Sequence, residues 1–138
     1  MAATLNKVNS FVEALAHKKH NLSSDTLQIA LTNASNAPVA GNSVLADLTQ
    51  ISYTNLSARV LTTSSSAQTG GVYKLVIADL VLTASGAVAP FRYVVIFNQT
   101  AANDELIGWY DYGSEITLAN GDTFTIDFDS SNGVLTLT

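Results

Sequence analysis

Two histidines near the N-terminus have a spacing that could bind a metal ion. His17 and His20 lie three residues apart on a segment with helical periodicity, so two imidazoles could meet one ion. No third ligand is nearby in the sequence, and two lysines lie between the histidines. Positive side chains are favourable at the C-terminal end of a helix because of its dipole. We therefore predict a solvated helix end and no metal site.

Two aspartates near the C-terminus have a spacing that suits acid–base chemistry. Asp127 and Asp129 alternate along an expected strand, which places their carboxyl groups on one side, about 6.5–7 Å apart. A glycosidase needs such a pair, one carboxyl as acid and the other as base or nucleophile. The two residues belong, however, to a regular alternation of polar and apolar positions, where solvent would keep both ionised. A solvated strand face is the better interpretation.

The same segment, residues 127–133 (DFDSSNG), begins like a calcium-binding loop, with oxygen-bearing side chains at its first, third and fifth positions. An EF-hand loop has glycine sixth and glutamate twelfth, whereas this chain has Asn132 and Thr138 there. A hairpin turn explains the segment better. Cysteine, a GxSxG motif and a phosphate-binding glycine loop are all missing from the sequence. We predict no catalytic, cofactor-binding or metal-binding residues, no cofactor, and no enzymatic activity.

Three aromatic residues form the remaining candidate site. Trp109, Tyr110 and Tyr112 could stack against sugar rings, although such residues more often fill a core or a protein interface. This leaves a carbohydrate-binding β-sandwich open as an alternative function.

Composition restricts the possible partners. Charged residues make up 12% of the chain and the net charge is −5, with basic residues scattered apart from Lys18 and Lys19. Nucleic-acid binding requires several cations on one face, so we expect none. The N-terminus lacks the pattern of a signal peptide, and no apolar run approaches the roughly 18–20 residues that span a bilayer. We therefore expect no membrane partner.

One short helix precedes the strands. Leu5, Val8, Val12 and Leu15 recur at three- and four-residue spacing, which predicts an amphipathic helix. Residues 10–13 (SFVE) match a capping box, so the helix begins at Ser10 or one turn earlier, near Thr4, and ends at residues 17–20.

The rest of the chain has the pattern of β-strands. A dense hairpin of residues 91–97 and 106–112 is apolar on both faces, so both faces must be covered: one by the core, the other by the helix or a neighbouring subunit. Further strands are expected at residues 26–31, 59–63, 72–83 (one strand, or two bent near residues 78–79) and 134–138. Residues 32–43 are predicted to form a loop and residues 64–71 a flexible turn.

The C-terminal region predicts a second hairpin. Residues 115–119 and 123–129 flank Asn120-Gly121, a pair that suits a type I′ turn. With eight or nine short strands, the prediction is an all-β fold, an antiparallel β-sandwich with a jelly-roll-like arrangement. One domain is expected over residues 1–138, with an N-terminal helix and arm (1–21) followed by the sandwich (22–138).

Most of the chain resembles a family of small structural proteins of tailed phages. The matching pieces are SDTLQIALT (24–32), ASG (84–86) and the run from FRYVV to GVLTL (91–137). Residues 111–113 (DYG) and 121–124 (GDTF) are the most specific of them.

The resemblance implies a virion component, most similar to capsid decoration (cement) proteins. Such a protein binds the major capsid protein on the outer surface of the head, often as a homodimer or homotrimer, after synthesis in the host cytoplasm. A tail, neck or fibre component is the alternative within the virion.

Overall fold

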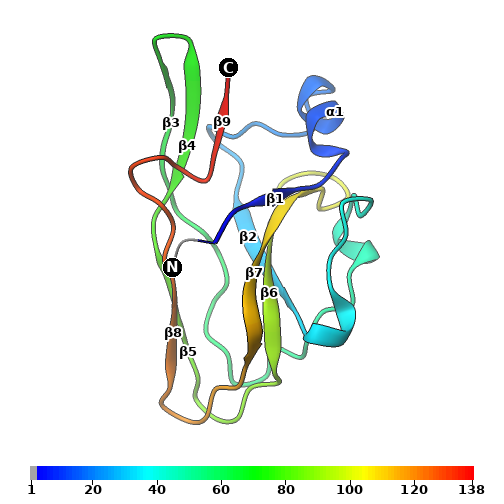
Figure 1. The fold of residues 1–138 in the computed structure, drawn as a ribbon, viewed down its shortest axis with the longest axis vertical. Helices are drawn as coiled ribbons and strands as arrows, with labels where there is room; N and C mark the ends of the chain where they lie inside the picture. Colours follow the sequence, from blue (N-terminus) through cyan, green and yellow to red (C-terminus); the bar gives the residue numbers. More distant parts are fainter. Residues whose placement is uncertain (1–2) are drawn as a thin grey trace.

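The computed structural model describes residues 3–138 and shows two layers of antiparallel strands (Figure 1). The first layer has the order β1-β7-β6-β2. Its strands are β1 (Asn6–Lys7), β2 (Leu27–Thr32), β6 (Phe91–Asn98) and β7 (Leu106–Ile116). The second layer contains the sheets β3-β4-β9 and β5-β8. Its strands are β3 (Thr63–Thr69), β4 (Val72–Ile77), β5 (Leu80–Thr83), β8 (Thr123–Ile126) and β9 (Leu135–Leu137). The predicted all-β sandwich is confirmed.

The central hairpin is present where the sequence predicts it. Strands β6 and β7 pair with Val94 opposite Tyr110 and Val95 opposite Trp109. They occupy the two middle positions of the first layer, and seven of the eight residues of β6 are buried. This strand is therefore covered on both faces.

The second cover is a long loop and not the N-terminal helix, while the alternative of a neighbouring subunit stays a prediction. The loop follows β2 and includes two 3₁₀ turns, η1 (Ala34–Asn36) and η2 (Leu45–Asp47). It begins near one end of β7, where the Ala34 N–H donates to Glu115 Oε1 (3.0 Å). It reaches the other end, where the Leu106 N–H donates to the carbonyl oxygen of Ser43 (2.9 Å). Four apolar side chains from this loop pack on the core: Leu45, Leu48, Ile51 and Tyr53.

Helix α1 (Phe11–Ala16) begins directly after Ser10, as one of the two predicted starts requires. The alternative start near Thr4 is wrong, because Asn6 and Lys7 form β1 beside β7. The capping box is also wrong, since the Ser10 side chain makes no capping hydrogen bond. With six residues, the helix buries only Phe11 and Ala14. Within residues 3–138, no helix has the length and hydropathy to cross a bilayer.

Three local predictions in or next to the second layer have different outcomes. Residues 72–83 divide into β4 and β5 around residues 78–79, which is one of the two forms expected. The flexible turn at residues 64–71 is wrong, because residues through Thr69 form β3 and only Gly70 and Gly71 make the turn, with φ of 60° and 85°. Most of β3 is exposed, so solvent accepts its polar side chains. The strand expected at residues 59–63 is reduced to a bridge between Val60 and Gln28 ahead of β3.

The predicted C-terminal hairpin is wrong in its pairing. Strand β8 pairs with β5, in the second layer, and residues 115–119 do not pair with it. The turn forms, with the Asp122 N–H donating to the Ala119 carbonyl oxygen (3.0 Å), but only Gly121 has a positive φ (87°). A type I′ turn needs positive φ at both central residues. The chain thus crosses from one layer to the other after β7.

Candidate functional site: the interlayer groove

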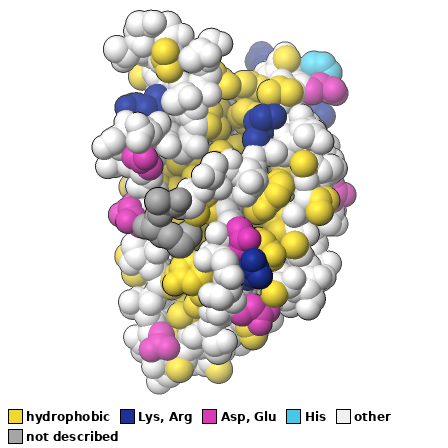
Figure 2. All heavy atoms as spheres, viewed as in Figure 1, with side chains coloured by type: hydrophobic (Ala, Val, Ile, Leu, Met, Phe, Trp, Pro, Cys, Tyr) yellow, Lys and Arg dark blue, Asp and Glu magenta, His cyan; other side chains and the backbone are white. Residues whose placement is uncertain are grey.

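A groove of about 810 Å³ opens between the two layers, beside β1. Figure 2 shows hydrophobic side chains in this hollow, with acidic and basic side chains around it. We call it the interlayer groove. It is lined by residues 3–5, Lys7, Phe11, Val94, Ile107, Tyr110, Tyr112, residues 124–129 and residues 133–137.

Two aromatic pairs join the walls of the groove. Tyr110 of β7 meets Phe128 edge to face, with ring centroids 6.0 Å apart, and Tyr112 meets Phe124 in the same way at 5.4 Å. Such pairs contribute about 0.5–1.5 kcal/mol beyond their buried area. Tyr112 remains 41% exposed, so its ring is also available at the opening.

The two walls present different parts of their strands. Strand β7 contributes Tyr110 and Tyr112, which lie two residues apart on one face, and Ile107, which lies at the register shift between Leu106 and Gly108. The second layer contributes the uninterrupted runs 124–129 and 133–137. Successive side chains of a strand point to opposite faces, so the strand residues 124–126 and 135–137 all reach the groove only along a strand edge. Within residues 3–138, β8 pairs only with β5 and β9 only with β4, which leaves this edge without a partner strand.

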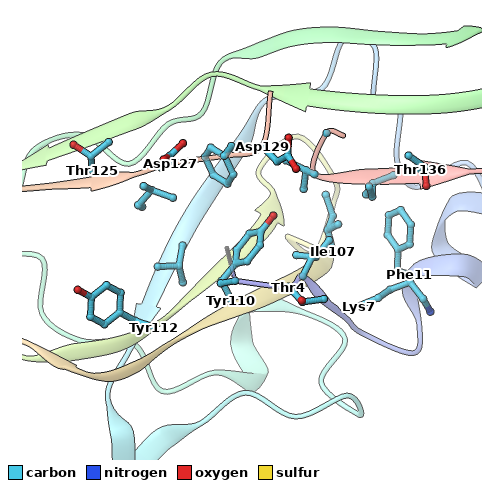
Figure 3. Close-up of a pocket in the computed structure, with 18 of the residues that line it drawn as sticks. Thr4, Lys7, Phe11, Ile107, Tyr110, Tyr112, Thr125, Asp127, Asp129 and Thr136 are labelled. Atoms are coloured by element: carbon cyan, nitrogen blue, oxygen red, sulfur yellow. The ribbon is translucent and has the colours of Figure 1, made fainter. Parts of the chain in front are cut away.

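Acidic side chains lie on the second-layer rim. Figure 3 places Asp127 and Asp129 on the side opposite Tyr110 and Tyr112. The Asp129 carboxylate accepts hydrogen bonds from the N–H groups of Ser131 (2.9 Å) and Asn132 (2.8 Å). These bonds hold the pKa of Asp129 below its ordinary value. Burial, with a contribution from the charge of Asp129, raises the pKa of Tyr110 to about 12.

The hydrogen bonds of Asp129 can be compared with the acid–base and calcium-binding interpretations of residues 127–133. Asp129 is a carboxylate that stabilises a turn, and its lowered pKa does not suit a general acid. The turn over residues 129–133 explains the oxygen-rich DFDSSNG segment, as the sequence indicates. A hydrogen bond from the Asn132 side-chain amide to Asp129 Oδ2 (2.9 Å) completes it.

The structure brings together only part of the predicted aromatic platform. Tyr110 and Tyr112 line the groove together with Asp127 and Asp129. The sequence does not predict that these four residues share one site. Trp109 directly precedes Tyr110 on β7, so its side chain points to the opposite face of the strand and does not line the groove. The sequence contains one signal for this, the alternation of faces along a strand.

The two histidines are separated. His17 is exposed, with Nδ1 3.9 Å from Glu13 Oε1, whereas His20 is buried against the Phe11 ring. Lys18 between them has a φ of 65°, so the chain turns sharply after the helix. Within residues 3–138, no group of three or more His, Asp or Glu side chains could hold a metal ion.

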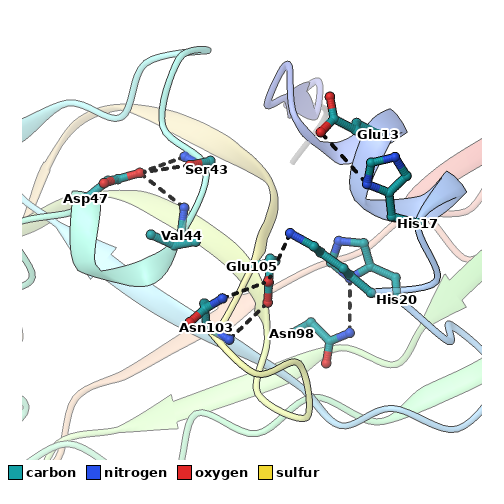
Figure 4. Close-up of polar contacts among 10 residues, drawn as sticks. Glu13, His17, His20, Ser43, Val44, Asp47, Asn98, Asn103 and Glu105 are labelled. Carbon is teal, nitrogen blue, oxygen red and sulfur yellow. Dashed lines mark hydrogen bonds and ion pairs between the residues drawn. The ribbon is translucent and has the colours of Figure 1, made fainter.

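A buried polar network under the helix was missed by the sequence analysis (Figure 4). The side-chain amide nitrogen of Asn98 donates to His20 Nδ1 (3.0 Å) and to Asp25 Oδ2 (2.7 Å). Beside Asn98, the Oε1 atom of buried Glu105 lies 3.8 Å from Lys19 Nζ. Burial lowers the pKa of His20. The members come from separate parts of the chain, so no local sequence pattern indicates them.

The comparisons with known proteins gave no relative: no family model, no curated protein and no solved structure matches this chain.

Proposed function

We propose that the protein is a viral structural protein, a capsid decoration (cement) protein of a tailed phage. It binds the outer surface of the head and stabilises contacts between major capsid subunits, as a homodimer or homotrimer. The sequence resemblance suggests this class. The structural observation that carries the proposal is the interlayer groove, where an apolar floor meets a strand edge that has no partner strand within residues 3–138.

The low charge of the chain also supports a protein-binding role. Charged residues make up 12% of the sequence, about half the share of roughly 25% that is common. A specific protein interface typically buries about 1,200–2,000 Å² in total. A surface rich in Ser, Thr and Asn loses less solvation in such an interface than a densely charged one. Many repeated copies then stiffen a shell that each contact alone stabilises only modestly.

The test is reconstitution on phage heads. Purified protein is added to mature heads that lack it, and the heads are sedimented and then heated. We expect the protein to sediment with the heads and to raise the temperature at which they disrupt. If the protein stays in the supernatant, the decoration function is wrong. Sedimentation with tails instead of heads would support the tail, neck or fibre alternative.

A carbohydrate-binding module is the second candidate, because Tyr110 and Tyr112 lie in one groove with Asp127 and Asp129. Aromatic rings and carboxylates are groups that sugars use for stacking and hydrogen bonding. Trp109 does not line this groove, which weakens the platform on which the candidate first rested. A glycan array with the wild type, Tyr112→Ala and Trp109→Ala tests it. Binding that disappears in Tyr112→Ala and persists in Trp109→Ala would support this candidate.

A further inference from the structure

We propose that the interlayer groove binds an extended, basic and apolar polypeptide segment of the protein's binding partner, which adds a strand to the β8–β9 edge. This inference rests on the proposed function for the identity of the partner, a capsid subunit, whereas the chemistry of the groove does not depend on it.

The strand edge beside the groove favours an extended peptide as the ligand. An unpaired edge presents a row of N–H and C=O groups, and an extended peptide is the ligand that satisfies such a row. On the β7 wall, β1 pairs with Gly108 and Trp109, and the Gly113 N–H donates to Asp111 Oδ1 (2.8 Å). The β8–β9 edge has no partner strand within residues 3–138. Because β1 already occupies part of the β7 edge, we place the incoming strand on the second-layer side.

The floor of the groove is apolar. Ile126, Phe128 and Val134 are buried there, and the partly exposed Tyr112 lies at the opening. A strand points alternate side chains to one face. An extended segment with apolar residues at every second position can thus bury them over this floor while its backbone pairs with the edge. Nine residues of such a segment span about 30 Å.

The charges around the groove favour a basic segment. Among residues 3–138, the Asp, Glu, Lys and Arg residues that line the groove are Lys7, Asp127 and Asp129. The two acidic residues lie on the rim beside the β8–β9 edge, and the whole chain carries a charge of −5. Lysine or arginine side chains on the solvent side of the incoming strand complement this rim, and acidic ones are repelled.

A peptide titration with the isolated protein tests the groove chemistry. The probe is a fluorescent nine-residue peptide in which valine and leucine alternate with lysine, and its control has glutamate in place of lysine. We expect saturable binding of the lysine peptide, at least tenfold tighter than that of the control. Tyr112→Lys should weaken this binding at least tenfold, and Val39→Lys, on the loop that covers the outer face of the first layer, should not. Equal effects of the two variants, or no saturation, would overturn the inference.

Crosslinking on heads separates this inference from the proposed function. The chain has no cysteine, so Thr136→Cys in the groove and Val39→Cys outside it can each carry one thiol-linked photocrosslinker. We expect Thr136→Cys to crosslink to a capsid subunit and Val39→Cys not to. If the protein binds heads and Thr136→Cys does not crosslink, the groove inference fails and the function stands. If the lysine peptide binds and heads do not, the function fails instead. If the protein binds a glycan but not the lysine peptide, and Tyr112→Lys abolishes the glycan binding, the ligand of the groove is a sugar and the peptide inference is wrong.

Discussion

Replacing Asn98 with alanine tests the buried network under helix α1. Asn98 is fully buried at the end of β6, and both the nitrogen and the oxygen of its side-chain amide form hydrogen bonds. Its nitrogen donates to His20 and Asp25, and its oxygen accepts from the N–H groups of Thr100 (3.0 Å) and Ala101 (3.2 Å). Because Asn98 donates to His20 Nδ1, the histidine proton lies on Nε2, which is buried and has no hydrogen-bond partner among residues 3–138.

The magnitude follows from the groups that the substitution leaves behind. In Asn98→Ala, His20 Nδ1 becomes a buried acceptor without a donor, which costs about 1–3 kcal/mol. The two turn N–H groups can bond to water, and the small cavity adds to the loss, so we expect about 2–4 kcal/mol in total. For a domain of this size, each kcal/mol lowers Tm by about 3–4 °C, which gives a fall of roughly 6–16 °C.

Urea unfolding monitored by tryptophan fluorescence, together with thermal scans, provides the measurement. Asn103→Ala is the matched control, because this exposed amide lies in the same turn and its side chain makes one long bond of 3.5 Å, to Glu105. We expect the control to lose less than about 0.5 kcal/mol. If Asn98→Ala is no less stable than Asn103→Ala, the network does not stabilise the fold and this reasoning is refuted.

Three further predictions concern His20, Gly108 and Asp129. Burial lowers the pKa of His20 below 6.5, so the unfolded chain binds the proton more readily than the folded one. The free energy of unfolding should therefore fall as the pH drops from about 6.5. The His20→Gln variant should flatten this pH dependence, and His17→Gln should not. Gly108→Ala should cost about 1–3 kcal/mol of unfolding free energy, since a Cβ there would lie 2.6 Å from the Asn6 carbonyl oxygen, and hydrogen exchange should show β1 released. Asp129→Ala should increase exchange at the N–H groups of residues 131 and 132, and unchanged exchange would contradict the turn-stabilising role of Asp129.

The elements that the sequence predicts correctly are those whose burial leaves a pattern. Strands β6 and β7 carry dense apolar residues because both faces of β6 are covered, so their positions can be read directly. Strand β3 carries no such pattern, since most of it is exposed and its polar residues resemble a loop. The cover over the first layer was missed for a related reason: it is a loop that contributes only scattered apolar side chains, such as Leu45 and Ile51.

Pairing partners are harder to predict than strands, and the C-terminal region shows why. Asn120-Gly121 is a strong local signal for a hairpin, yet β8 pairs with β5. The Phe124 ring packs edge to face on Phe91 (5.6 Å) and on Tyr112 (5.4 Å), both from the opposite layer. These contacts require Phe124 to lie across the core from β7, which a local hairpin in the same sheet would prevent. Tertiary packing of the aromatic rings therefore overrides the turn preference.

The same crossing creates the interlayer groove. If β8 paired with residues 115–119, it would extend the first layer, and its edge would lie at the end of that sheet. Because β8 crosses to β5, its other edge, which has no partner strand within residues 3–138, lies opposite the face of β7 that carries Tyr110 and Tyr112. An edge that can pair and an apolar face that can be covered then border one opening, which is what an added strand needs. The sequence shows the residues on both walls, but only the long-range pairing of β8 with β5 makes them one site.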